Sequence, residues 1–180
     1  MKIFAQSDTH FGHSKLVEYG VRPEGFSELI LSRYRSISAD VLIHCGDFCI
    51  GNDEEWHDEF MERTNHLFLS RIFVLGNHDH KTKTWYMKRG WDMVCDEITL
   101  NVYGKSIVFS HKPVLKREGV DINFHGHLHG KGVLSHRQVK GLDPTFHVDL
   151  APEIRKYSPV NIGREVEKLF PPKLDALELP

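Results

Sequence analysis

Five short polar segments of the chain carry side chains that bind metal ions or transfer protons, and each follows a run of apolar residues. They are Ser7-Asp8-Thr9-His10, His44-Cys45-Gly46-Asp47, Gly76-Asn77-His78-Asp79, Ser110-His111 and His125-Gly126-His127-Leu128-His129. Their carboxylate, amide and imidazole groups suit Mn²⁺, Fe, Zn²⁺ or Ni²⁺. Because one ion takes about four to six such ligands, their number predicts two ions.

The spacing within these segments suggests how the side chains are presented. One residue separates Asp8 from His10, and one separates His127 from His129. An extended chain points residues two apart toward the same side, so both pairs are predicted to face the site from extended backbone. A glycine directly precedes a candidate ligand in three segments, at residues 46, 76 and 126, where a small residue permits a tight turn and close backbone approach.

In order along the chain, the five segments read D-x-H, G-D, G-N-H-D, a single H and G-H-x-H, over residues 8–129. This set closely resembles the calcineurin-like metallophosphoesterase superfamily, in particular its small bacterial and phage-type members. A lone D-x-H or G-D motif carries little information. The complete ordered set, with each member after a predicted strand, is specific.

The resemblance implies a binuclear metal centre and a role for each residue. The first ion would be held by Asp8, His10, Asp47 and His129, and the second by Asp47, Asn77, His111 and His127, with Asp47 bridging them. A hydroxide shared by the two ions would attack a phosphate ester in line. The resemblance also implies that His78 contacts the phosphate and protonates the leaving oxygen, while Asp79 orients His78.

One departure from the family narrows the expected substrate. Phosphoprotein phosphatases extend the second segment to G-D-x-x-D-R-G, whereas this chain has Gly46-Asp47-Phe48-Cys49-Ile50-Gly51-Asn52. The resemblance therefore favours phosphodiesters, with a phosphomonoesterase or a nuclease as alternatives and a non-catalytic scaffold as a further one. The nearby His13 is predicted to contact substrate phosphate together with Asn77 and His78.

The elements around these segments indicate a layered α/β sandwich of central β-sheets flanked by helices. Unbroken apolar runs predict buried strands at residues 2–5, 41–43, 72–75, 106–109 and 120–124, and a further strand at 146–150. Apolar residues at helical spacing predict helices beginning near Phe26, with Ser27 as a cap, and near Trp56, with Asn52 or Asp53 as N-cap and Leu67 toward its end. Shorter helices are predicted at 82–89 and 164–170.

Length and composition fit one globular domain over residues 1–180, with a loosely packed tail from about 171. The net charge of −2 argues against a protein that coats DNA. The apolar runs are too short for a membrane span, and three cysteines cannot form a closed disulfide framework, which favours a cytoplasmic location. The expected partner is a phosphate-ester substrate, including nucleotides or nucleic acid; the sequence gives no oligomeric state.

The remaining candidates have simpler interpretations. His44 and His125 are predicted to be core or sheet-face residues, Cys45 and Cys49 to pack as small apolar residues rather than bind zinc, and His80 to line the cleft. Surface or packing positions are predicted for His57, His66, His136 and His147. Two basic clusters, Lys81-Lys83-Lys88-Arg89 and Lys112-Lys116-Arg117, are more often solvated faces but could attract a polyanion. Trp85, Tyr86 and Trp91 are expected to pack rather than stack on a base.

Overall fold

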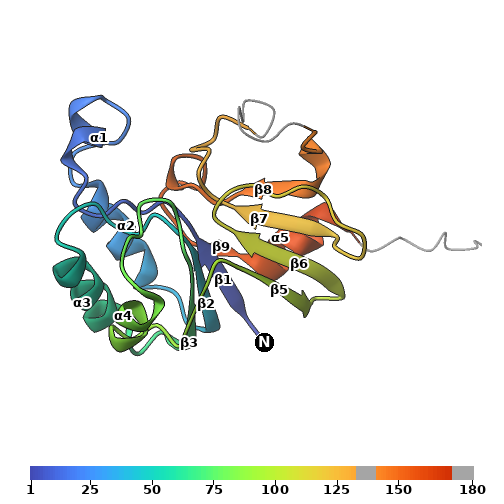
Figure 1. Ribbon diagram of the computed structural model, residues 1–180, viewed down its shortest axis with the longest axis horizontal. Coiled ribbons are helices and arrows are strands. Elements are labelled where there is room, and N and C mark those ends of the chain that lie inside the picture. Colours follow the sequence, from blue (N-terminus) through green and yellow to red (C-terminus); the bar gives the residue numbers. More distant parts are fainter. Residues whose placement is uncertain (133–140, 172–180) are drawn as a thin grey trace, which may run out of the picture.

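Two β-sheets form the centre of the computed structural model, which describes residues 1–132 and 141–171 (Figure 1). The first sheet has the order β4-β3-β2-β1-β9, from Met93–Cys95, Phe68–Val74, Ala39–Cys45, Ile3–Gln6 and Val160–Asn161. Its strands pair in parallel except for β9, which is antiparallel to β1. The second sheet has the order β5-β6-β7-β8, from Glu97–Val102, Lys105–Ser110, Ile122–His125 and His147–Asp149. Here only β5 and β6 are antiparallel.

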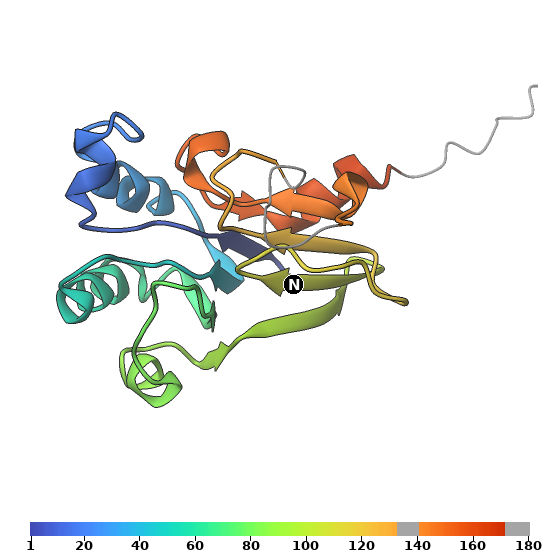
Figure 2. The same ribbon diagram turned by 45° about the horizontal axis from the view of Figure 1, so that its top comes forward.

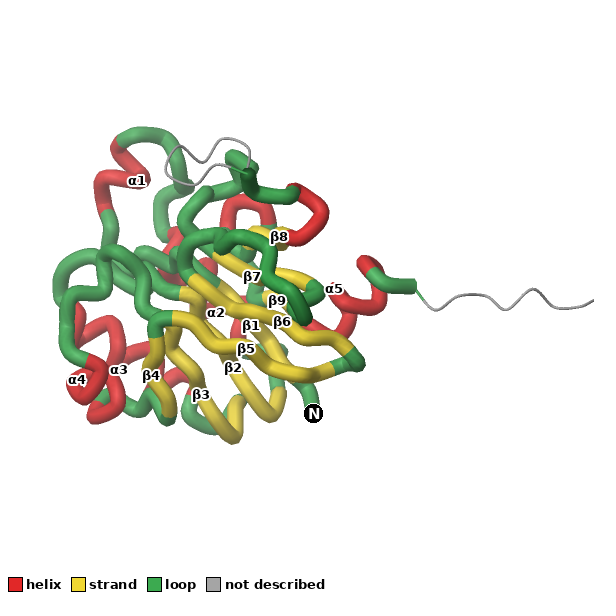
Figure 3. Tube along the Cα trace, turned by 45° about the vertical axis from the view of Figure 1, so that its right-hand side comes forward, coloured by secondary structure: helices red, strands yellow, loops and turns green. Residues whose placement is uncertain are grey.

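Helices cover the first sheet on the face turned away from the second sheet. They are α2 (Phe26–Tyr34), α3 (Asp53–Thr64) and α4 (Lys83–Lys88), and Figure 3 shows α3 and α4 beside β3 and β4. A short α1 (Ser14–Glu18) projects beyond them, and α5 (Ile162–Leu169) follows β9 (Figure 2). Two 3-10 helices, η2 (Pro144–Phe146) and η3 (Pro152–Ile154), flank β8. The fold is therefore the predicted layered sandwich.

Alternation of side chains along β2 explains why the first sheet is buried on both faces. Ile43 and Cys45 lie in the core shared with the second sheet, together with Ile107 and Phe124 from β6 and β7. Leu42, which directly precedes Ile43, lies in the other core, against the helices. Because successive residues of a strand point to opposite faces, an unbroken apolar run is what such a strand requires, and this is the pattern that the sequence showed.

Several predicted boundaries were wrong. Helix α2 begins after Gly25, and the Ser27 hydroxyl accepts the Gly12 N–H instead of capping the helix. Leu67 lies beyond the end of α3. Strand β5 was missed because its residues alternate between partly buried and exposed positions, so no apolar run marks it; β4, β9 and α1 are too short to stand out. The predicted loose tail lies largely outside the described residues, as does His136.

Over the described ranges, no helix is long and apolar enough to cross a membrane.

Candidate metal centre

The loops that carry the candidate ligands are joined to one another in pairs by backbone hydrogen bonds. After β1 and β2 the chain continues side by side: Asp8 donates its N–H to the carbonyl of Gly46 (2.9 Å), and His10 donates to that of Asp47 (3.0 Å). After β6 and β7, the Gly126 N–H donates to the carbonyl of His111 (2.9 Å). The loops therefore continue the parallel strand pairing past the carboxyl ends of the strands, where ligands bind in open α/β sheets.

The prediction of extended backbone at the Asp8/His10 and His127/His129 pairs is wrong. Asp8 and His10 have φ angles of 49° and 46°, and His127 and His129 have 70° and 48°. Asp47 is also left-handed, with φ 54°. Aspartate and histidine tolerate this region better than most residues, and such backbone strain concentrates at functional sites. The alternating left-handed turns bring the side chains together in a way that residue spacing alone could not predict.

Glycines at two predicted positions permit contacts that no other residue would allow. A Cβ atom added to Gly76 would lie 2.2 Å from Oδ1 of Asp47, and one added to Gly126 would lie 2.2 Å from Oδ2 of Asp8. Both distances are far below van der Waals contact. The loops after β3 and β7 thus pass directly against the two buried carboxylates, which confirms the predicted close approach.

A first group of candidate ligands consists of Asp8, His10 and His129, whose ligand atoms lie within 4.8 Å of one another. The Asp8 carboxylate is fully buried and accepts the His127 backbone N–H with both oxygens, at 3.1 and 2.9 Å. His129 Nε2 lies 3.7 Å from Asp8 Oδ1, and His10 Nε2 lies 4.0 Å from it. His10 Nδ1 has no hydrogen-bond partner among the described residues, although it is buried.

A second group consists of Asp47, His111 and His127, again within 4.8 Å. The Asp47 Oδ2 atom lies between the groups: it is 3.4 Å from His111 Nε2 and 3.7 Å from Nε2 of His10 in the first group. Asn77 joins the second group through Oδ1, which is 2.9 Å from His111 Nε2. All seven predicted ligands are thus brought together, with Asp47 where a bridging carboxylate would lie.

The hydrogen bonds of His111 test whether this cluster suits a cation. Its Nδ1 lies 3.0 Å from the carbonyl oxygen of Cys45, which can only accept, so Nδ1 carries the proton. In the neutral ring Nε2 then presents a lone pair toward Asn77 Oδ1 and Asp47 Oδ2. Three acceptor atoms facing one another without a proton repel, and a cation between them would satisfy all three. The residues therefore fit a divalent metal ion.

Burial sets the protonation states of the first group. It raises the pKa of Asp8 to about 6, because the charges of His111 and His129 compensate only part of the desolvation. Burial, with the positive charge of Arg22, lowers the pKa of His10 far below its usual range and keeps this imidazole neutral, the state that binds metal. A buried carboxylate with so little compensation is electrostatically unfavourable until a cation joins it.

His78 stands at the mouth of the cluster. Its side chain is 46% exposed and its Nε2 lies 4.0 Å from Asp47 Oδ2, while its backbone N–H donates to Asp47 Oδ1 at 2.8 Å. The ring packs edge-on against His10, with 5.5 Å between centroids. His78 is therefore close to the candidate ligands while its ring remains accessible to a substrate.

The predicted orienting of His78 by Asp79 stays a prediction: in the described part of the chain, no hydrogen bond or ion pair joins Asp79 to the His78 imidazole. The Asp79 carboxylate instead accepts backbone N–H groups from Gly76 (2.7 Å), Asp47 (2.8 Å) and Phe48 (3.2 Å). Burial raises its pKa, although these hydrogen bonds partly compensate. Asp79 therefore holds the turn that presents Asp47.

A family model described as the calcineurin-like phosphoesterase superfamily domain matches residues 1–146. The chain belongs to this superfamily.

One solved structure agrees well with this fold. A protein of unknown function from Aquifex aeolicus has a TM-score of 0.69 and 26% sequence identity, over 93% of this chain and 98% of its own. More distant matches are an archaeal phosphodiesterase (TM-score 0.48, 18% identity, 90% and 99% covered) and a Vps29 single mutant from Entamoeba histolytica (0.47, 17%, 83% and 73%). No curated protein sequence matches the chain.

Two residues beside the superfamily's ligand motifs were missed by sequence reasoning. Arg22 is buried and donates to the backbone carbonyls of Asp8 and Thr9, each at 2.6 Å. Glu153 binds both Arg22 (2.9 Å) and His129 Nδ1 (3.0 Å). Neither residue lies in a ligand motif or in a segment with periodic apolar residues, so the sequence offered no signal for them.

Most of the other histidines are packed or exposed as predicted, whereas the phosphate contact of His13 and the cleft position of His80 stay predictions. His13 is partly buried, with its ring centroid 5.6 Å from that of His10, beside the first group. His44 and His125 are buried, and His57 packs on Phe48 with 4.1 Å between ring centroids. His66 and His80 are exposed, and His147 is intermediate. The cysteines also agree: Cys45 and Cys49 are buried without a disulfide.

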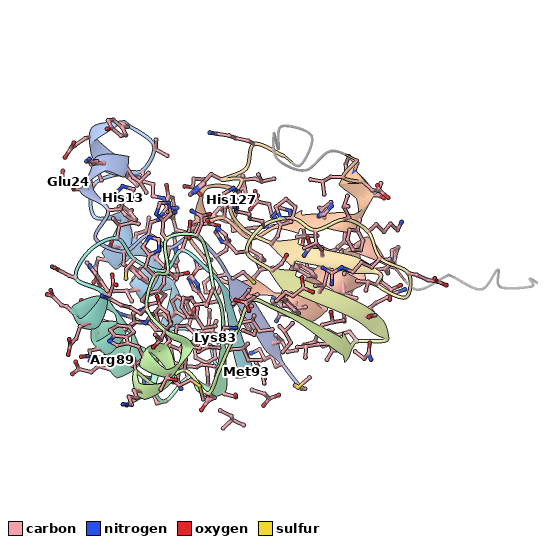
Figure 4. The ribbon with its side chains drawn as sticks, in the orientation of Figure 1. His13, Glu24, Lys83, Arg89, Met93 and His127 are labelled. Carbon is pink, nitrogen blue, oxygen red and sulfur yellow. The ribbon has the colours of Figure 1, made fainter. Side chains whose placement is uncertain are left out.

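The basic clusters do not form a rim of unpaired charge. Lys83 pairs with Asp96 (2.5 Å), Lys81 with Asp53 (3.7 Å), and Arg89 with Asp58 (2.7 Å) and Glu54. Lys116 pairs with Asp143, and Arg117 with Glu97. Figure 4 shows Lys83 and Arg89 at the end of the molecule away from His13 and His127. Tyr86 and Trp91 are buried as expected, so neither can stack on a base.

Proposed function

We propose that this chain hydrolyses phosphate esters with two divalent metal ions, and that it prefers phosphodiesters to phosphomonoesters. The observation that carries the proposal is that two carboxylates, four imidazoles and one amide oxygen form two adjoining groups. Asp47 Oδ2 lies between these groups, 4.0 Å from the partly exposed ring of His78. Membership of the superfamily supports it. Manganese is the metal we place first, with iron, zinc and nickel as alternatives that suit the same donors.

In this proposal the two groups bind the metal ions, and His78 and His13 act on the substrate. When bound, the ions supply a water of lowered pKa and neutralise the phosphate oxygens. Asp8, His10, Asp47 and His129 would hold the first ion. Asp47, Asn77, His111 and His127 would hold the second. His78 reaches the leaving oxygen and donates a proton to it, which general acid catalysis requires within hydrogen-bond distance. His13, beside the first group, binds a phosphate oxygen.

A compact diester fits this surface better than a long nucleic-acid strand. A nuclease needs a row of unpaired cations to bind phosphates, whereas five cationic side chains of the two clusters are ion-paired with carboxylates. The absence of the phosphoprotein phosphatase extension after Asp47 is consistent with a diester substrate. A nucleotide-sized diester is therefore the partner that we propose, and the cytoplasmic location stays a prediction.

The test is hydrolysis by protein stripped of metal and then given Mn²⁺, Zn²⁺, Ni²⁺ or Mg²⁺ in turn. The substrates are bis(4-nitrophenyl) phosphate and 4-nitrophenyl phosphate, which release the same chromophore from a diester and a monoester. Asp47→Ala, purified in parallel, controls for a contaminating hydrolase. Metal-dependent diester cleavage that is absent from Asp47→Ala supports the proposal.

Other outcomes contradict it in distinct ways. A preference for the monoester makes the chain a phosphomonoesterase. Two bound ions without hydrolysis of either ester or of a dinucleotide panel identify a non-catalytic member of the superfamily.

A further inference from the structure

We propose that Arg22 and Glu153 are positioning residues that fix the tautomer of His129 and the turn at Asp8, and thereby set the metal affinity of the first group alone. The inference rests on the proposed metal centre, but it concerns two residues that belong to none of the ligand motifs. Three distant segments meet here: the loop before α2, the 3-10 helix η3 and the loop after β7.

Arg22 is enclosed so fully that it cannot reach a substrate. Its side chain is 0% exposed. The guanidinium donates through Nη1 to the Thr9 carbonyl (2.6 Å), through Nη2 to the Asp8 carbonyl (2.6 Å), and through Nε to Glu153 Oε1 (2.9 Å). These bonds hold the carbonyls of the left-handed turn at Asp8. Only a planar fork of donors serves three acceptors in this way, so lysine is a poor replacement.

Glu153 determines which nitrogen of His129 carries the proton. Glu153 Oε1 lies 3.0 Å from His129 Nδ1 and also accepts from Arg22. The Arg22 guanidinium forms an ion pair with this carboxylate, with both Nε and Nη2 at 2.9 Å from Oε1. The carboxylate can therefore only accept, and Nδ1 must donate. In the neutral ring Nε2 then keeps its lone pair, directed toward Asp8 Oδ1 at 3.7 Å, which is the tautomer that a metal ligand needs.

The second group has a different support, which makes the inference specific. His111 Nδ1 is fixed by the backbone carbonyl of Cys45, which no substitution removes. Among the described residues, no hydrogen bond or ion pair joins Arg22 or Glu153 to His111 or Asn77. A change at Glu153 should thus weaken one ion and leave the other.

The first experiment counts and titrates Mn²⁺ binding to the metal-free full chain by equilibrium dialysis and calorimetry. Glu153→Gln removes the charge and offers an amide whose NH₂ can face Nδ1 and select the wrong tautomer. Glu165→Gln is the matched control, because Glu165 is 17% exposed against 16% for Glu153 and pairs with Arg155 at 3.4 Å. We expect one of two binding steps to weaken by about 10- to 100-fold in Glu153→Gln, and neither in Glu165→Gln. Equal weakening of both steps, or of neither, overturns the proposal.

The second experiment observes the tautomer directly and needs no metal. Imidazole ¹⁵N spectra of the metal-free wild type at pH 9 should show a protonated Nδ1 and an unprotonated Nε2 at His129, and Glu153→Gln should lose this pattern. A wild type with the opposite tautomer overturns the inference even if the variant fails to fold. A protein that shows the expected tautomer but binds no Mn²⁺ would instead contradict the proposed function, so the two failures are distinguishable.

Discussion

The two halves of the candidate metal centre differ in their supporting contacts and in the exposure of one ligand. In the first, Asp8 and His10 are 0% and 3% exposed, Arg22 donates to the Asp8 carbonyl, and Glu153 hydrogen-bonds to His129. In the second, Asn77 is exposed and borders a cavity of about 280 Å³, lined also by Leu75 and Lys112. Each half has two buried ligands and one partly buried histidine, but the second also includes Asn77, which is exposed to solvent.

This difference suggests a division of tasks. In the first half, Arg22 and Glu153 hold Asp8 and His129 in place before an ion arrives, so this half should hold its ion firmly. The second half, where Asn77 borders the cavity, has room for a substrate oxygen beside its ion. We therefore expect the first ion to exchange slowly and the second to be the one that meets the substrate.

The largest loss of activity and metal binding is expected at Asp47, which lies between the two halves. Asp47→Ala removes the carboxylate shared by both groups, so both ions should bind weakly and diester hydrolysis should fall to background. Metal content by mass spectrometry and the chromogenic assay measure this together. A variant that keeps two tightly bound ions would show that Asp47 does not bridge the groups.

A matched pair of histidine variants separates the two halves. His129→Ala and His127→Ala each remove one imidazole from the same loop. His129 belongs to the first group, with Asp8, and His127 belongs to the second, with Asp47. Each should lose one ion, with the remaining ion exchanging slowly in His127→Ala and rapidly in His129→Ala. Exchange of ⁵⁴Mn²⁺ against unlabelled Mn²⁺ measures the rates. Identical exchange in both variants would remove the distinction between the halves.

His78→Ala should affect catalysis without affecting metal binding. The ring is exposed and belongs to neither ligand group. Loss of acid–base help costs on the order of 10²–10⁴-fold in rate, while both ions should remain. The cost should be smaller for a diester with a good leaving group such as 4-nitrophenol, which needs less protonation. Full activity in the variant would assign His78 a structural role.

The burial of Asp8 also predicts that the stability of the metal-free protein depends on pH. Burial raises the folded-state pKa of Asp8 from 3.8 to about 6. A protonated Asp8 therefore favours the folded state below pH 3.8, and this advantage is lost as the pH rises through 6. Asp8→Asn, which can still accept the His127 N–H, should raise the free energy of unfolding at pH 7.5 by on the order of 2 kcal/mol. The gain should shrink toward pH 4, and urea unfolding at both pH values measures it. A gain independent of pH would mean that Asp8 is not charged when buried.

The smallest effects are expected at the paired surface cations. Lys83→Ala and Arg117→Ala each remove a side chain already neutralised by Asp96 or Glu97. Such exposed pairs contribute on the order of 1 kcal/mol or less, so the KM for a dinucleotide should change by less than about threefold, as measured at low and moderate salt. A large rise in KM that disappears in salt would restore the nuclease alternative.

The sequence was sufficient to predict which candidate ligands the structure brings together, because ligand chemistry is local. The residue type decides what Asp47 or His111 can bind, and the apolar run before each places it at the end of a strand. The same reasoning failed at β5, where only every second residue is partly buried. It also gave no sign that the Asp79 carboxylate accepts N–H groups from Asp47 and Phe48, residues on another loop.

Only the tertiary structure decided how the ligands meet and what holds them. Left-handed backbone at Asp8 and His10 depends on hydrogen bonds from Arg22 and on the pairing with the loop after β2, which spacing cannot encode. Glu153 reaches His129 across 24 residues of chain. The sequence by itself thus determined which atoms can bind metal, since this is a property of each side chain. Orientation, tautomer and charge balance depend on neighbours that are close only once the chain has folded.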